Sequence, residues 1–139
     1  MHFKLEHIGI AVKKIKDSEE LFKKLFEVSP YKSERVESEK VSTTFFKTGE
    51  SKIELLEATD NESPIARFIE KKGEGIHHIA FEVEDIRKEM KRLENEGFTL
   101  LSSEPKKGAD NKLVCFLHPK STNGVLIELC QEIREVVGK

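Results

Sequence analysis

Two histidines and two glutamates lie inside otherwise apolar segments of this 139-residue sequence, namely His7, Glu54, His78 and Glu128. Burying an ionised carboxylate is costly without a partner, and a single buried histidine is usually a core residue with satisfied hydrogen bonds. Together, however, two imidazoles and two carboxylates form a mixed nitrogen and oxygen ligand set that suits a divalent ion such as Co, Mn, Ni, Zn or Fe. We therefore predict a metal site formed by these four residues.

The four residues recur at matching places of an internal repeat. The segment LEHIGIAV at 5–12 has the same pattern as IHHIAFEV at 76–83, and both glutamates stand in an Ile-Glu-Leu triplet. The histidines are 71 residues apart and the glutamates 74, which fits one register with a small loop insertion. His78 rather than His77 aligns with His7. Because neighbours on a strand face opposite ways, we expect His77 to point away from the site.

The elements that must position these residues also repeat. In each half an apolar strand is followed by an amphipathic helix and then by two strands around a turn. Asp17 and Ser18 are predicted to cap the first helix, and Gly97 is predicted to end the second. We interpret residues 1–139 as one domain with modules at 1–60 and 75–131, joined by a helical linker at 61–74. The tail after Gln131 is expected to be frayed or weakly helical.

Composition excludes several functional classes. Apolar residues make up 37% and charged residues 36% of the chain, and the net charge of −2 gives no general basic field for nucleic acid. The apolar runs are far shorter than a membrane span. Cys115 and Cys130 lack metal-binding spacing and are expected to be buried thiols. With no basic leader at the N-terminus, we expect a cytoplasmic protein.

Several segments are specific enough to indicate a family: LEHIGIAV, SPIARFI, GIHHIAFEV, and HPKS followed by GVLIEL. Through them the chain resembles the methylmalonyl-CoA epimerases of the vicinal oxygen chelate superfamily, from about Leu5 to Gln131. The resemblance implies an α+β fold in which two tandem βαβββ modules form a curved mixed sheet of eight strands around a central metal site. It also implies a homodimer that binds an acyl-CoA and interconverts (2R)- and (2S)-methylmalonyl-CoA.

That reaction requires acid–base groups on both faces of the substrate carbon C2. The C2 proton is weakly acidic because its removal gives an enolate, which a divalent ion chelating the thioester and carboxylate oxygens stabilises. The resemblance assigns metal binding to His7, Glu54, His78 and Glu128, and proton abstraction to Glu128. Several relatives carry the second base where our alignment places Thr43, and threonine is not a comparable base near neutral pH. Glu54, or a water on the metal, is left for that role.

The resemblance places the acyl-CoA near loops that carry Lys106, Lys107, His118, Lys120 and Ser121. Of these, we predict Lys106, Lys120 and Ser121 as substrate-binding residues, because lysines can meet carboxylate or phosphate groups as point charges. The same lysines also suit a solvated surface, and Ser121 also suits a turn.

Other interpretations share the fold. A lactoylglutathione lyase (glyoxalase I) would use a similar ligand set on a glutathione hemithioacetal. A ring-cleaving dioxygenase would use two histidines and one carboxylate, so four protein ligands count against it. A non-catalytic small-molecule-binding protein usually lacks the complete quartet, so the quartet favours an enzyme.

Overall fold

The strands of both halves lie side by side in one mixed sheet in this computed structural model, which describes residues 3–134. The order across the sheet is β2-β3-β4-β1-β5-β8-β7-β6. The strands are β1 Lys4–Ala11, β2 Lys32–Val36, β3 Val41–Thr48, β4 Ser51–Ala58, β5 Gly75–Glu82, β6 Lys106–Lys107, β7 Lys112–Leu117 and β8 Ile127–Glu132. The helices are α1 Ile15–Phe26, α2 Pro64–Lys72 and α3 Ile86–Asn95, with 3-10 turns η1 Glu37–Glu39 and η2 Pro119–Ser121.

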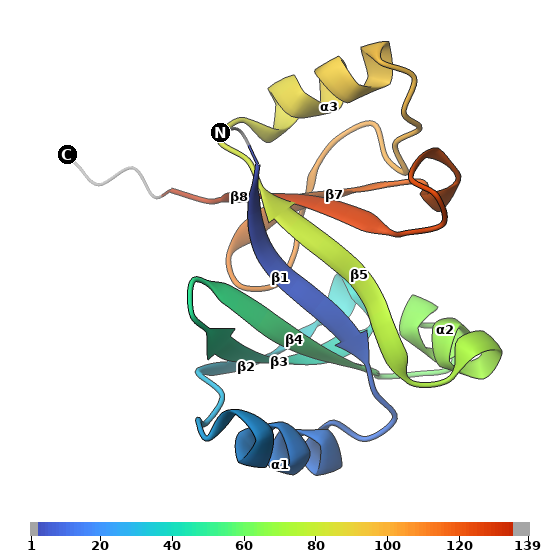
Figure 1. The fold of residues 1–139 in the computed structure, drawn as a ribbon. Coiled ribbons are helices and arrows are strands. Elements are labelled where there is room, and N and C mark those ends of the chain that lie inside the picture. The colour runs from blue at the N-terminus through green and yellow to red at the C-terminus, as the bar shows by residue number, and fades with distance from the viewer. Residues whose placement is uncertain (1–2, 135–139) are drawn as a thin grey trace.

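The two halves of the sheet are built in the same way. β1 pairs with β4 in parallel and β5 pairs with β8 in parallel, while β1 and β5 meet antiparallel at the centre. In Figure 1 the sheet curls, and α1 and α3 lie at opposite ends of the molecule. The predicted α+β fold with two βαβββ units in one curved mixed sheet is confirmed. The module boundaries remain our interpretation of this strand order.

Helices α1 and α3 cover one side of the sheet, whereas α2 packs against Leu56 on the other side, where Ile65 of α2 lines the cavity of the site. Leu55 of β4 packs in a cluster with residues of α1, and Leu129 of β8 packs with residues of α3. Since neighbouring strand residues face opposite ways, Glu54 and Glu128 point to the other side. Burial of the Ile-Glu-Leu triplets under the helices therefore aims both carboxylates into the interior of the curl.

The first helix begins earlier than predicted, so the assignment of Asp17 and Ser18 as its caps is wrong. Its N-cap residue is Lys14, which makes no side-chain cap. A partner distant in sequence replaces the local cap, because the Ile15 N–H donates to Glu57 Oε1 at 2.8 Å. Gly97 follows α3 with φ of 99°, in agreement with its predicted role as a stop.

The remaining sequence expectations concern the cysteines, the tail and membrane spans. Cys115 and Cys130 are buried free thiols, and burial raises the pKa of Cys115 to about 11. β8 continues through Gln131 to Glu132, so this part of the tail is strand, and 135–139 lie outside the described residues. No helix within residues 3–134 is long and apolar enough to cross a membrane.

Candidate metal centre and active site

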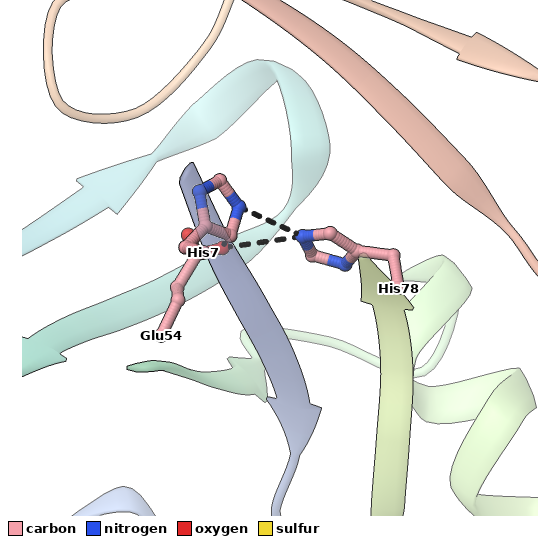
Figure 2. Close-up of side chains that lie close together, drawn as sticks. All are labelled: His7, Glu54 and His78. Atoms are coloured by element: carbon pink, nitrogen blue, oxygen red, sulfur yellow. Dashed lines mark hydrogen bonds and ion pairs between the residues drawn. The ribbon is translucent and has the colours of Figure 1, made fainter. Parts of the chain in front are cut away.

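The four predicted ligands converge at the centre of the sheet. His7 Nε2 lies 3.1 Å from His78 Nε2, and Glu54 Oε1 lies 3.2 and 3.4 Å from these two nitrogens. Glu128 Oε1 lies 3.5 Å from His7 Nε2 and 3.1 Å from His78 Nε2. Figure 2 shows His7, Glu54 and His78 turned toward one another from three strands. All four residues are at most 5% exposed, so water screens these contacts little.

The spacing of these atoms fits a metal ion. Metal bonds to histidine nitrogen and carboxylate oxygen are about 2.0–2.2 Å, so adjacent ligand atoms lie about 3.0 Å apart at right angles and about 3.4 Å apart at the tetrahedral angle. The distances around His7 Nε2 and His78 Nε2 run from 3.1 to 3.5 Å. The donor atoms of His7, Glu54 and His78 all lie within 4.8 Å of one another, a set that does not include Glu128. The ligand types and the spacing of these three residues thus agree with a divalent ion, and Glu128 adjoins the set through its contacts with both histidines.

Without an ion, the histidines and the glutamates favour each other's charged forms. Burial disfavours the charged form of each group, but hydrogen bonds with the two glutamates raise the pKa of His78 to about 9 and raise that of His7 well above its usual value. Burial also disfavours the carboxylates, yet the histidines lower the pKa of Glu128 to about 2 and lower that of Glu54. A divalent cation would take the place of the histidine protons as the positive charge that faces the two carboxylates.

A third buried carboxylate, Glu6, adjoins the centre and was missed from sequence. Glu6 Oε1 lies 2.7 Å from His7 Nδ1, the ring nitrogen that faces away from the other ligands. Its second oxygen pairs with Lys52, and Lys112 Nζ lies 3.8 Å from it. Asp110 completes this cluster, 3.5 Å from Lys52 Nζ. Carboxylates that bond to a metal-binding histidine in this way fix its orientation.

His77 does not point away, so that expectation is wrong. Its Nδ1 lies 3.0 Å from Nδ1 of His78, and its ring packs edge-on against Phe68. Burial lowers the pKa of His77 to about 4, so this imidazole is neutral near pH 7. The alternation argument fails here because the strand is irregular at this residue, where the β1–β5 register shifts.

A partly open cavity leads to the four ligands. Its walls include Thr43, Phe45, Leu56 and Phe116, so the space beside the carboxylates is largely apolar. Thr43, which our alignment predicts to stand where several relatives carry their second base, lines this cavity and is only 1% exposed.

The predicted substrate-binding residues divide into two groups. Lys106 lines a second cavity, which shares lining residues such as His77 and Phe116 with the first. Lys120 and Ser121 are not among the described residues that line either cavity. Ser121 Oγ instead accepts a hydrogen bond from the Thr99 N–H, 22 residues away in the sequence. The structure therefore brings Lys106 toward the centre but not Lys120 or Ser121.

Comparisons with known proteins agree with this arrangement. Residues 6–116 match the family model of the glyoxalase/bleomycin resistance protein/dioxygenase superfamily. The chain is 41% identical to the mitochondrial methylmalonyl-CoA epimerase of Dictyostelium discoideum over 91% of this chain and 76% of that one. It is 40% identical to the ethylmalonyl-CoA/methylmalonyl-CoA epimerase of Cereibacter sphaeroides over 92% of this chain and 97% of that one.

A solved structure extends the likeness to the fold. A variant of the Streptomyces coelicolor methylmalonyl-CoA epimerase, in complex with 2-nitronate-propionyl-CoA, superposes with a TM-score of 0.91 and 30% identity. The superposition covers 95% of this chain and 96% of that one. The chain therefore belongs to the glyoxalase/bleomycin resistance protein/dioxygenase superfamily and, within it, to the methylmalonyl-CoA epimerase family.

Proposed function

We propose that the chain is a metal-dependent isomerase that interconverts (2R)- and (2S)-methylmalonyl-CoA. The observation that carries this proposal is the convergence of two buried carboxylates on two buried imidazole nitrogens at the end of an apolar cavity. Such a site can hold a divalent ion and still offer a carboxylate base to a bound thioester. Methylmalonyl-CoA epimerases are also among the relatives that match nearly the whole chain.

The residues of the centre would have two roles in the reaction, metal binding and proton transfer. His7, Glu54, His78 and Glu128 would hold the ion, for which Co, Mn, Ni, Zn and Fe are all suited to the ligand set. When bound, a divalent ion stabilises the negative charge that develops on the thioester and carboxylate oxygens of the substrate. The Glu128 carboxylate, beside the ion, would accept the proton from C2.

Inversion needs a second proton-transfer group, and Glu54 is the group that we propose for it. Our alignment places Thr43 where several relatives carry their second base, and the Thr43 hydroxyl donates to the Glu34 carbonyl at 3.4 Å. That hydroxyl cannot take up a proton near pH 7. Glu54 is the other carboxylate beside both histidines, 3.2 and 3.4 Å from their Nε2 atoms, and its proximity supports the proposal that it returns the proton to C2.

The finer assignments of partner and location belong to the same proposal. The apolar wall beside Glu128 suits the methyl group of the acyl chain, and Lys106 at the adjoining cavity suits an anionic part of the substrate. We keep Lys120 and Ser121 as residues that would contact the coenzyme A portion outside the cavities. We also propose a homodimer in the cytoplasm, which sedimentation and cell fractionation would test.

Exchange of the C2 hydrogen with solvent deuterium tests the function directly. Methylmalonyl-CoA is incubated in deuterium oxide with metal-stripped protein and with protein restored by each divalent ion. We expect exchange only after metal is restored, and no exchange with any ion would refute the epimerase. Formation of lactoylglutathione from the glutathione hemithioacetal would favour a glyoxalase instead.

A variant of the base completes this test. Glu128→Gln keeps the shape and an oxygen ligand but removes the basic carboxylate. Its exchange rate should fall by about 100-fold or more, which is the size of a general-base contribution. A rate close to that of the unchanged protein would exclude Glu128 as the base.

A further inference from the structure

Two matched β-bulges lie at the centre of the sheet, one directly before each of the predicted metal-binding histidines. In the β1–β5 pair, Leu5 faces Phe81 and His7 faces Ala80, so Glu6 is the extra residue on β1. Further along, Gly9 faces His78 and Ile10 faces Ile76, so His77 is the extra residue on β5. A bulge redirects the extra side chain out of the normal alternation.

The bulges stand at equivalent places of the two modules. Glu6 and His77 are 71 residues apart, the same separation as His7 and His78. Each bulge residue lies on the same side of the sheet as the histidine that follows it, because the two side chains are in contact. Glu6 is 5% exposed and lines the same cavity as His77. The repeat thus includes a supporting residue as well as the ligand.

Each bulge residue contacts the same atom of its histidine. Glu6 Oε1 lies 2.7 Å from Nδ1 of His7, and His77 Nδ1 lies 3.0 Å from Nδ1 of His78. In both cases Nε2 remains directed at the other ligands, and the two Nε2 atoms lie 3.1 Å apart. If Nδ1–H donates at each contact, each Nε2 carries the lone pair that a metal requires.

The two supports differ in chemistry. The Glu6 carboxylate is an anion compensated by Lys52 and Lys112. His77 is an imidazole held edge-on by Phe68, and in its Nε2–H tautomer it would accept through its Nδ1 lone pair. A carboxylate makes its histidine the more basic and stronger ligand, whereas a neutral acceptor orients its histidine without adding charge.

We propose that Glu6 and His77 are paired positioning residues, which fix His7 and His78 in the Nδ1–H tautomer and aim both Nε2 atoms at the metal. This inference rests on the metal site of the proposed function, but it does not depend on which substrate the site accepts. It assigns the two bulges a role in metal binding, and it makes His7 the more tightly held of the two histidines.

The tautomers are measurable in the unchanged protein. Histidine is labelled with nitrogen-15, and two-bond proton–nitrogen correlation spectra are recorded on the zinc-loaded protein. We expect His7 and His78 both to carry the proton on Nδ1 and to be coordinated through Nε2. Coordination of either ring through Nδ1 would overturn the inference without any substitution.

Paired variants test the supports themselves. Glu6→Leu and His77→Leu each remove the acceptor, and zinc affinity measured against a competing chelator should fall roughly 10–100-fold. Glu6→Gln keeps an acceptor oxygen and should recover most of that loss. Glu50→Leu is the matched control, because Glu50 is an exposed carboxylate paired only with Lys4 among the described residues. Circular dichroism before each titration selects folded protein.

The outcomes separate this inference from the proposed function. Unchanged zinc affinity in both leucine variants would overturn the positioning role even if epimerase activity is present. Conversely, the expected tautomers and affinity losses in a protein that exchanges no C2 hydrogen would support the positioning role and refute the epimerase.

Discussion

The imidazole of His78 lies against Gly9, its partner across the antiparallel pair of β1 and β5. A Cβ atom at Gly9 would lie 2.5 Å from Nδ1 and 2.6 Å from Nε2 of this ring, which is closer than atoms can approach. In the equivalent pair of the other module, His7 faces Ala80, so a methyl group is accommodated there. The position of His78 thus depends on the absence of a side chain at residue 9.

Gly9→Ala should therefore weaken metal binding while leaving the fold intact. The added methyl group must displace the His78 ring, and overpacking of this kind costs about 1–3 kcal/mol. We expect zinc affinity to fall by roughly 5- to 150-fold, since 1.4 kcal/mol corresponds to a factor of ten. Ala80→Gly is the matched control, because it removes a methyl group from the equivalent position. Equal affinity of the Gly9→Ala variant and the unchanged protein would contradict the role given to this contact.

Glu54→Gln should separate proton exchange from inversion. Glutamine retains an oxygen ligand but cannot return a proton, so Glu128 would still remove the proton from one epimer. We expect the C2 hydrogen of a single epimer to exchange with deuterium, while conversion to the other epimer falls by about 100-fold or more. Chiral analysis of the recovered thioester, alongside mass spectrometry, measures both. Normal epimerisation by this variant would show that another group serves as the second base.

The repeat is the reason that the fold and four candidate ligands could be predicted from the sequence. An Ile-Glu-Leu triplet within a strand forces the glutamate away from the helix-covered side, and the structure shows this at Glu54 and Glu128. Alignment of the two halves then identified His7 and His78, rather than His77, as the equivalent histidine ligands. All four side chains meet as expected.

The supporting residues could not be predicted because their placement depends on pairing between distant strands. Glu6 and His77 each precede a histidine at the same repeat position, but simple alternation turns both away from it. Only the register of β1 against β5 creates the bulges that reverse this. The start of α1 was mispredicted for a related reason, because Glu57 from β4 bonds the Ile15 N–H in place of a local cap.

The stability of the metal-free protein should decline at both ends of the pH range. The raised pKa of His78, about 9, means that its ion pairs stabilise the fold fully below about pH 6.5 and are lost as the pH rises through 9. The lowered pKa of Glu128, about 2, gives stability that is present above pH 4.5 and lost as the pH falls through 2. Urea unfolding with chelator at several pH values measures this.

A double variant, Glu54→Gln with Glu128→Gln, is the control for the predicted loss of unfolding free energy at alkaline pH. Without carboxylate partners, His78 loses the reason for its raised pKa, so the decline in unfolding free energy between pH 6.5 and 9 should disappear. Persistence of the same decline in this variant would show that it comes from groups outside the centre.

Metal binding should release at least one proton at neutral pH. In the metal-free protein His78 is protonated at pH 7, and the 3.1 Å between its Nε2 and that of His7 leaves room for one hydrogen between the rings. Coordination through Nε2 requires the lone pair, so this proton must leave. Isothermal titration calorimetry in buffers of different ionisation enthalpy counts the protons, and the number released should fall at pH 10, where His78 is already neutral. An enthalpy independent of the buffer at pH 7 would contradict the charge state that we assign to the site.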